Sequence, residues 1–386
     1  MSNPPTIGVF SGYYPSHGGG IEIVTGILSE GLAARYPVLW CALDDGPATP
    51  QRIRREPLAG SDFAYRITGT PMPIPSPRAF GRIWRAVGAS DVVLIADANF
   101  ITNAIAFVAA KFRGRSVVVT QHLGLPSTAS LFARLLTYLS QRLITRPILR
   151  TADKVIYVSS AVQQHFSEVA TRSGPLVIGH GVDKSLFHPA NGPKERDRQR
   201  CSFDFARGQR IASFVGRCTL SKGVTVIAEM ARLRPDWTFV IAGSGPIDPA
   251  DWNLPNVRVL GHLEPNQVAA LYQASDVVLL PSPSESFSLV VREALACGAP
   301  VICGDSILMT DPKLGPHLRA IPVDLEEIEQ TAVSFSEALD RAPPAAAPAA
   351  AYVAECCSWE IIVAQYADTI ERIAEVRTGT EWAVAA

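Results

Sequence analysis

Short apolar runs alternate with segments of helical periodicity along the first half of the chain. A helix is predicted over Ile21–Tyr36, where apolar residues recur at helical spacing. Uninterrupted apolar runs predict strands over Thr6–Phe10, Asp91–Asp97, Ser116–His122 and Asp153–Ser159. Because such strands are apolar on both faces, they are typical of a parallel sheet that helices cover on both sides.

The same alternation restarts in the second half. Helices are predicted over Lys222–Leu233 and Asn266–Ala274. Strands are predicted over Arg210–Arg217, Thr238–Gly243, Asn256–Gly261 and Asp276–Ser282. Two such α/β units predict two Rossmann-like, doubly wound domains that face each other across a cleft. Ligands in sheets of this kind bind beyond the carboxyl ends of the strands.

Polar and low-complexity segments set the predicted domain boundaries. The polar run His188–Arg200 indicates a linker, and Ala342–Ala351 indicates a connector before a closing helix over Ser358–Val376. Between Thr49 and Pro77 the chain is rich in proline and arginine and predicts an irregular excursion. The predicted parts are an N-terminal domain (1–190), a linker (191–208), a C-terminal domain (209–357) and a C-terminal helical segment (358–386) that returns to the N-terminal domain.

Composition narrows the class of protein. The 386 residues are 47% hydrophobic and 18% charged, with a formal net charge of −1, so nothing favours nucleic acid as a partner. The apolar runs are too short and interrupted to span a membrane, and the N-terminus resembles no signal peptide, which favours a cytoplasmic protein. The seven cysteines are scattered without a CxxC pair, which argues against a disulfide framework and a structural zinc site.

The segment Pro281–Ile302 holds two carboxylates that could bind a ligand together. Glu285 is predicted in the loop after a strand, and Glu293 in the helix that follows. A carboxylate offers two acceptor oxygens, which match the neighbouring hydroxyls of a sugar. The start of the helix offers backbone N–H groups for an anion, those of Phe287, Ser288 and Leu289. The alternative is that both glutamates are ordinary helix acids.

Two further loops follow predicted strands. Arg217 and Lys222 come after the strand that starts the second half, and two cations there could neutralise a leaving diphosphate. Three glycines ending at Gly20 precede the first helix, where the backbone could approach a ligand closely. The alternatives are a solvated surface pair and a plain flexible loop.

Taken together, "GGGIE", "VGRCTLSKGV", "VIAGSGP" and "PSPSESFSLVVREALACGAPVI" resemble the retaining glycosyltransferases of family 4, also called group 1. The motifs follow in the expected order, and the resemblance extends from about Ile7 to about Ile373. It implies the GT-B fold, with an acceptor-side N-terminal domain and a C-terminal domain that binds a nucleotide sugar.

The resemblance also implies roles for individual residues. Arg217 and Lys222 match the pair that contacts the donor diphosphate, Glu285 the glutamate at the donor sugar, and Glu293 the glutamate that binds ribose. Further donor-binding positions are implied for Gly19, Gly20, Leu263, Phe287, Ser288 and Leu289, and a catalytic one for His122. A lone histidine is as often structural.

The implied reaction moves a hexose-type sugar from a UDP- or GDP-sugar to a hydroxyl of a glycan or lipid-linked glycan, with retained configuration. Cell-surface polysaccharide, lipopolysaccharide or glycolipid synthesis is the expected setting. No cofactor and no metal are expected, because basic side chains and helix ends hold the phosphates and the chain shows no Asp-x-Asp motif. A catalytically silent nucleotide-sugar-binding subunit and a nucleotide-sugar epimerase on the same fold are the alternatives.

Three segments stand apart from the family pattern or leave two interpretations open. His180 stands where the family usually has asparagine. After Ile302 the chain lacks the usual glycine pair and glutamate. Leu131–Arg150 contains four arginines and no acid, so it is either a helix packed in its domain or a peripheral contact with the cytoplasmic face of the membrane.

Overall fold

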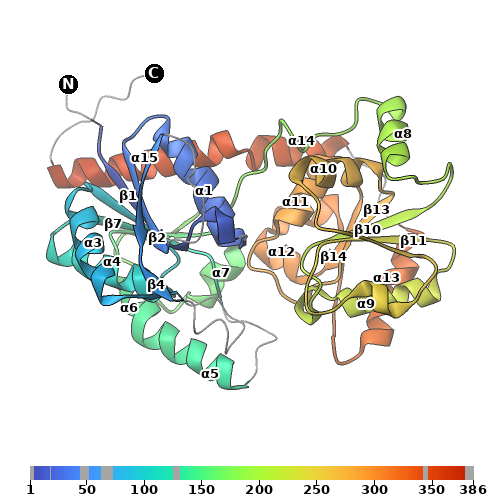
Figure 1. Ribbon diagram of the computed structural model, residues 1–386, viewed down its shortest axis with the longest axis horizontal. Coiled ribbons are helices and arrows are strands. Elements are labelled where there is room, and N and C mark those ends of the chain that lie inside the picture. The colour runs from blue at the N-terminus through green and yellow to red at the C-terminus, as the bar shows by residue number, and fades with distance from the viewer. Residues whose placement is uncertain are drawn as a thin grey trace. The chain divides into compact units, whose positions relative to one another are not determined.

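A computed structural model describes residues 4–17, 19–43, 52–61, 73–124, 131–341 and 347–378. The chain forms two compact units (Figure 1). Unit 1 comprises Met1–His180 together with Trp359–Ala386, and unit 2 comprises Gly181–Ser358. No helix within the described ranges is long and apolar enough to cross a membrane.

Unit 1 is built on a seven-stranded parallel sheet of order β3-β2-β1-β6-β7-β8-β9. The chain order reverses between β1 and β6, which makes this pair the switch point of the sheet. The strands are β1 (Ile7–Tyr13), β2 (Val38–Leu43), β3 (Ile53–Leu58), β6 (Val92–Ala96), β7 (Ser116–Gln121), β8 (Lys154–Tyr157) and β9 (Leu176–Val177). A separate antiparallel pair joins β4 (Gly60–Ser61) to β5 (Ile74–Pro75).

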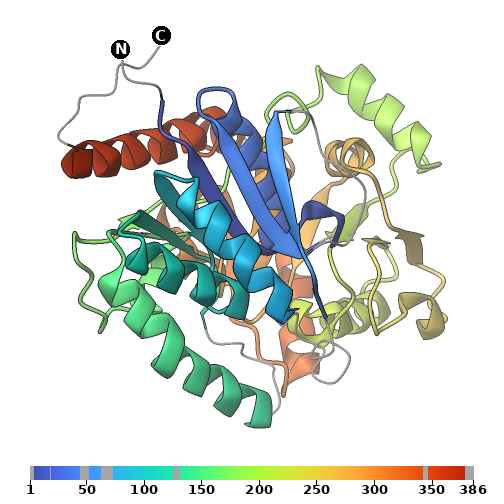
Figure 2. The ribbon, with the colours of Figure 1, turned by 60° about the vertical axis from the view of Figure 1, so that its left-hand side comes forward.

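Helices pack on the sheet of unit 1. Leu28 and Leu32 of α1 (Gly20–Ala33) share a buried cluster with Ile362 and Tyr366 of α15 (Trp359–Thr378), so the last helix completes this core. α3 (Pro77–Gly88) packs against α4 (Ile101–Phe112), as Figure 2 shows. The other helices in the described part of this unit are η1 (Pro15–His17), α5 (Leu131–Ser140), the π-helix η2 (Gln141–Thr145), α6 (Arg146–Thr151) and α7 (Ser160–His165).

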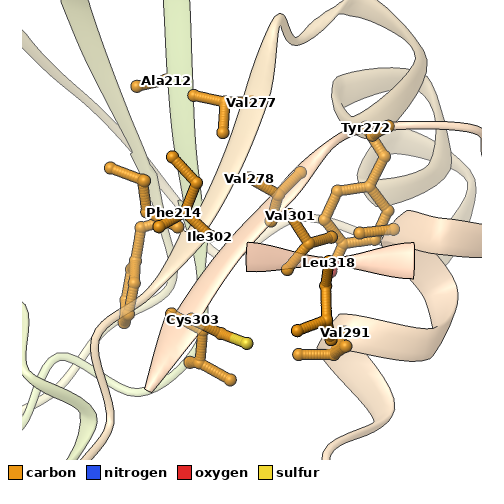
Figure 3. Packing of buried hydrophobic residues seen from close by; sticks show 14 of the residues in the cluster. Ala212, Phe214, Tyr272, Val277, Val278, Val291, Val301, Ile302, Cys303 and Leu318 are labelled. Atoms are coloured by element: carbon orange, nitrogen blue, oxygen red, sulfur yellow. The ribbon is translucent and has the colours of Figure 1, made fainter. Parts of the chain in front are cut away.

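Unit 2 repeats the design with a six-stranded parallel sheet of order β12-β11-β10-β13-β14-β15. Its switch point lies between β10 and β13. The strands are β10 (Ile211–Val215), β11 (Thr238–Ala242), β12 (Val257–Gly261), β13 (Val277–Leu280), β14 (Val301–Gly304) and β15 (Arg319–Ile321). Phe214, Val278, Ile302 and Val291 lie in its buried core (Figure 3).

The helices of unit 2 contact one another in pairs: α9 with α13, α10 with α8, and α11 with α14. Their bounds are α8 (Pro193–Ser202), α9 (Val224–Leu233), α10 (Pro265–Ala274), α11 (Leu289–Ala296), α12 (Ser306–Thr310), α13 (Ile328–Leu339) and α14 (Ala347–Cys356). Short 3-10 turns are η3 (Leu220–Lys222), η4 (Pro249–Trp252) and η5 (Pro312–His317).

The predicted α/β class with two Rossmann-like domains is confirmed, but three segments differ from the prediction. The predicted linker 191–208 contains α8, which contacts α10, and the units divide after His180. The predicted connector contains α14 from Ala347 onward, because Ala349 and Val353 join the core of unit 2. The predicted excursion holds β3, whose register on β2 buries Ile53 and Leu58 at its ends. Residues 49–51, 62–72 and 342–346 lie outside the described ranges.

Candidate functional site

Two charged side chains meet at the switch point of unit 2. Lys222 ends the loop after β10, and Glu285 lies in the loop after β13, the neighbouring strand. The Lys222 Nζ atom lies 2.6 Å from Glu285 Oε1. The Glu285 side chain is 6% exposed and that of Lys222 is 34% exposed. The buried carboxylate is therefore held by a cation that solvent, or a ligand, can still reach.

Arg217 lies in the same loop as Lys222. Its side chain is exposed, and it makes no ion pair with any residue that the structure describes. Both predicted cations thus follow β10, and Lys222 is the one that contacts Glu285. The position of positive charge at a strand's carboxyl end suits an anionic ligand at the switch point.

Gly223 explains how Lys222 reaches Glu285. This glycine has φ +68° and is the N-cap of α9, and a Cβ there would lie 1.8 Å from the carbonyl oxygen of Pro281. The close approach brings the loop after β10 against the end of β13. The Ser282 hydroxyl donates to the carbonyl of Ser221 over 3.0 Å and ties the two loops together.

Helix α11 begins beside Glu285 in the sequence and has a defined cap. Ser288 is the N-cap, and its hydroxyl accepts a hydrogen bond from the Val291 N–H over 3.4 Å. Gly298, with φ +71°, follows the helix end, as predicted. The first N–H groups of an α-helix have no partner within the helix, so the region of Phe287, Ser288 and Leu289 can face an anion.

Glu293 lies on α11, about 7 Å along the helix axis from Ser288. Burial raises the pKa of its carboxyl to about 7, and the hydroxyl of Tyr272 opposes this shift in part. The same burial, together with the charge of Glu293, raises the pKa of Tyr272 well above its usual value. Glu293 therefore changes charge near neutral pH.

Arg292 is a residue that sequence reasoning missed. Its side chain is 1% exposed, and its guanidinium carbon lies 3.7 Å from the centroid of the Phe287 ring. Its Nη1 donates to the carbonyl of Ser288 over 3.1 Å. The available signal was an arginine inside an otherwise apolar helix, "LVVREALA". Arg292 therefore holds the turn from which the N-terminus of α11 starts.

The segment that departs from the family pattern supplies the partner of Arg292. Asp311 lies between α12 and η5, and its Oδ2 is 3.6 Å from Arg292 Nη2. The same oxygen accepts the Tyr352 hydroxyl over 2.9 Å. Burial lowers the pKa of the Arg292 guanidinium, and Cys357 and Asp311 oppose that shift. The departing segment is thus tied to α11 through a buried ion pair.

The predicted residues of unit 1 lie at the carboxyl end of its sheet. Gly19 is the N-cap of α1, and Gly20 is its first residue. A Cβ at Gly19 would lie 2.1 Å from the Glu22 carboxylate, so the backbone and this acid are in close contact. Asp97 follows β6 with φ +71° and accepts the backbone N–H groups of His122 and Leu123 over 3.1 and 2.9 Å.

His122 is buried at the end of β7, and burial lowers the pKa of its imidazole to about 3. It is therefore neutral at physiological pH. Its ring stacks on that of His180, with 5.1 Å between centroids, so the residue that replaces the family's asparagine packs on the predicted catalytic histidine. The catalytic role of His122 stays a prediction.

Leu263 follows β12 and packs, partly buried, on a core cluster that contains Ile211 and Val240. This packing alone explains why the position is apolar, and no ligand is needed for that. The predicted place of Leu263 beside a nucleobase stays a prediction. Within the described ranges, no group of three or more His, Cys, Asp or Glu side chains could hold a metal ion.

Two family models match the chain. Glycosyltransferase Family 4 matches residues 18–186, and Glycosyl transferases group 1 matches residues 195–312. The first match contains Gly19, Gly20 and His122, and the second contains Lys222 and Glu285. The chain belongs to the group 1 glycosyltransferases.

Relatives and solved structures agree with this family. The D-inositol 3-phosphate glycosyltransferase of Mycolicibacterium smegmatis is 34% identical over 54% of this chain and 50% of that protein. A GDP-mannose-dependent alpha-mannosyltransferase of the same organism is 30% identical over 66% of this chain and 65% of that protein. The chain therefore spans less than two thirds of these relatives.

The fold matches over nearly the whole chain. A sucrose-phosphate synthase from Thermosynechococcus elongatus superposes with a TM-score of 0.73 at 20% identity, covering 96% of this chain and 100% of that one. HepE of Anabaena, in complex with UDP and glucose, superposes with a TM-score of 0.71 at 18% identity, covering 95% of this chain and 99% of that one. The group 1 glycosyltransferase fold of this chain is therefore of the GT-B type.

Proposed function

We propose that the protein transfers a hexose-type sugar from a nucleotide-diphosphate donor to a hydroxyl of a glycan or lipid-linked glycan. The observation that carries this proposal is the Lys222–Glu285 contact of 2.6 Å at the switch point of unit 2. A partly exposed cation and a buried carboxylate, side by side, match a ligand that joins a diphosphate to a polyhydroxylated ring. Arg217, in the same loop, adds a second cation.

Each charged residue of the candidate site in unit 2 then has a part in donor binding. Lys222 and Arg217 neutralise the diphosphate as it leaves, and the N-terminus of α11 adds backbone N–H donors. Glu285 accepts hydrogen bonds from hydroxyls of the sugar. The ionised Glu293 accepts hydrogen bonds from both ribose hydroxyls, because a carboxylate has two acceptor oxygens.

We propose that transfer retains the configuration at the sugar carbon without a covalent sugar–enzyme intermediate. The acceptor oxygen forms its bond to that carbon on the face from which the phosphate leaves. The carbon–oxygen bond to phosphate breaks with its electron pair, and the phosphate oxygen takes the proton of the acceptor hydroxyl. The protein supplies position and charge.

Two similar proteins support the donor class. One is a GDP-mannose-dependent alpha-mannosyltransferase, and the other is HepE, whose structure was solved in complex with UDP-glucose. We propose a UDP- or GDP-sugar as co-substrate, with no further cofactor. Cytoplasmic assembly of a cell-surface polysaccharide or glycolipid is the setting that this chemistry fits best.

A thermal-shift screen of UDP-, GDP- and ADP-sugars tests donor binding directly. The matching donor should raise the melting temperature, because a ligand that binds only the folded state stabilises it. Transfer, or slow hydrolysis of that donor, should then follow in a product assay. Binding without either reaction would instead indicate a catalytically silent subunit, and formation of an epimeric nucleotide sugar would indicate an epimerase.

Donor affinity is expected to rise with pH across neutrality. The pKa of Glu293 is raised to about 7, so its carboxyl is mostly protonated at about pH 6 and mostly ionised at about pH 8. If the ionised form binds ribose, the association constant should rise up to about tenfold over this range. Calorimetric titration of the donor at the two pH values measures the association constant. The phosphates of a nucleotide sugar do not titrate in this range, so the change reports on the protein. The Glu293→Gln variant should bind weakly at both pH values, and an unchanged pH profile in that variant would contradict the role of Glu293.

Arg292 is expected to position the donor site without touching the reacting atoms. Replacing it with methionine removes the contacts to Phe287 and the Ser288 carbonyl, and should raise the donor Kd about tenfold, with a smaller change in kcat. Arg292→Lys should restore the Kd only in part. An ammonium cannot at once cover the Phe287 ring, donate to the Ser288 carbonyl and pair with Asp311. A structural role alone would lower the melting temperature while the folded variant kept the wild-type Kd.

A further inference from the structure

An apolar groove opens on unit 1, and none of its lining residues is assigned to the donor. It has a volume of about 680 Å³ and is lined by α3, α4 and one residue of the π-helix, Ile144. Every lining side chain is apolar. α3 and α4 contact each other and lie side by side in Figures 1 and 2.

Large apolar side chains at this groove are exposed to solvent. On α4, Phe112 is 81% exposed and Val108, one turn earlier, is 51% exposed. On α3, Phe80 and Trp84 are likewise exposed at a spacing of one turn. Contiguous exposed apolar side chains are uncommon on monomeric proteins and mark an interaction surface. We call the groove with these four residues the α3–α4 face.

Basic residues predominate over acidic ones on the elements that line this face and on the segment around Ile144. Neither α3, nor α4, nor the segment from Leu131 to Thr151 contains an acidic residue, although the whole chain has a formal net charge of −1. Exposed arginines of these elements and their ends are Arg78, Arg82, Arg85, Arg113, Arg142 and Arg150. The Arg113 guanidinium lies 4.4 Å from the centroid of the Trp84 ring, at the groove itself. Lys111 and Arg146 are paired with Asp153 and Glu168, so their charges count for less.

We infer that the α3–α4 face docks on the surface of an anionic lipid membrane. Aromatic side chains enter the boundary between headgroups and acyl chains, and arginines beside them contact lipid phosphates. α3 packs one side in the domain, and it presents Phe80 and Trp84 to solvent at the groove and Arg78, Arg82 and Arg85 on a further side, so both apolar and basic side chains of this helix can reach a membrane surface.

A second copy of the chain fits the face less well. A two-fold interface brings identical patches together, so the arginine-rich rims of two copies would repel each other. An anionic bilayer offers opposite charge and an apolar interior at the same time. The packing of Ile148 and Leu149 into unit 1 also shows that α6 contributes buried residues, while Leu143 before it is 71% exposed. Part of Leu131–Arg150 thus packs in the domain, and contact of its exposed part with a membrane stays a prediction.

Docking here would hold a transferase next to a lipid-linked acceptor. The inference deepens the proposed function, but vesicle binding by unit 1 requires neither donor nor transfer. The two can therefore fail separately.

Vesicle co-sedimentation of the full chain tests the inference. Vesicles of phosphatidylcholine with about three-tenths phosphatidylglycerol should bind the protein, and pure phosphatidylcholine vesicles should bind it far less. Arg78→Glu with Arg85→Glu should lower the partition coefficient on the order of 25-fold or more, at roughly fivefold for each basic side chain lost. Val108→Ser with Phe112→Ser should lower it at least tenfold.

Matched variants on unit 2 provide the controls. Arg198→Glu with Arg207→Glu makes the same change in net charge, and Leu233→Ser with Val333→Ser removes two exposed apolar side chains from helices. Both controls should pellet like the wild type. Calorimetric donor binding and sedimentation velocity are measured on every variant. Failure of the wild type to bind anionic vesicles, equal loss in the controls, or a wild-type dimer that Phe112→Ser converts to monomer would overturn the inference. If the wild type bound anionic vesicles but no nucleotide sugar, only the proposed function would be contradicted.

Discussion

Replacing Lys222 with alanine is expected to lower the rate of sugar transfer at least 100-fold. Its ammonium is the only cation that contacts Glu285 among the described residues, and a preorganised charge at a developing anion typically contributes a factor of about 100 to 1,000 in kcat. Glu285→Ala should cause a loss of similar size, because the donor sugar would lose its hydrogen-bond acceptor. Initial rates of product formation at saturating donor measure both effects.

The loss must be separated from unfolding, since Lys222→Ala leaves the Glu285 carboxylate, 6% exposed, without its cation. The double variant Lys222→Ala with Glu285→Gln removes that buried charge and should melt closer to the wild type. If the pair acts as a unit, the double variant should be no slower than the worse single variant. Lys194→Ala, an exposed lysine on α8, is the matched control and should keep full activity. Wild-type turnover in both single variants would reject the assigned roles.

Much of the candidate site could be predicted because it depends on local chain geometry. A strand, a proline-flanked loop and a helix place Glu285 from sequence alone, and α11 and Gly298 lie where the pattern predicts them. The sequence allows either Ser286 or Ser288 as the cap of this helix, and the structure shows Ser288. That Lys222 touches Glu285 could not be derived in this way. The contact joins residues 63 apart in sequence and depends on the pairing of β10 with β13.

The elements that escaped prediction are those whose stability comes from tertiary contacts. α14 occupies an alanine-rich stretch whose composition resembles a linker, and burial of Ala349 and Val353 in the core of unit 2 decides its structure. α8 has almost no apolar residues, yet Arg196 and Arg200 both pair with Asp276 beside β13. Hydrophobic periodicity does not detect a helix held by ion pairs.

The Arg292–Asp311 pair shows a further limit of sequence reasoning. The segment after Ile302 differs from the family pattern, because the usual glycine pair and glutamate are absent there. The structure shows that this segment supplies Asp311 to a buried arginine on α11. The departure and the arginine are therefore one structural feature, since a buried arginine requires an acidic partner.

Substituting alanine for Gly223 is expected to destabilise unit 2 by about 3 kcal/mol or more and to abolish transfer. The residue has φ +68°, which costs a non-glycine residue about 1–2 kcal/mol. The added Cβ would also lie 1.8 Å from the Pro281 carbonyl oxygen, a backbone atom that cannot rotate away. The loop after β10 must then separate from the end of β13, which moves Lys222 away from Glu285. Denaturant unfolding measures the stability, and the transfer assay measures the activity.

Gly208 provides a matched control in the same unit. It has φ +79°, but a Cβ there would meet no atom within 4 Å, so Gly208→Ala keeps the backbone strain without the clash. This variant should lose only about 1–2 kcal/mol and retain full activity, because it lies before β10 and carries no site residue. If the two variants unfolded at the same denaturant concentration, the close approach of Gly223 to Pro281 would not be what positions Lys222. If Gly223→Ala were instead folded and active, Lys222 would reach its place without the contact between the two loops, and the assignment of the site to the β10–β13 switch point would lose its structural basis.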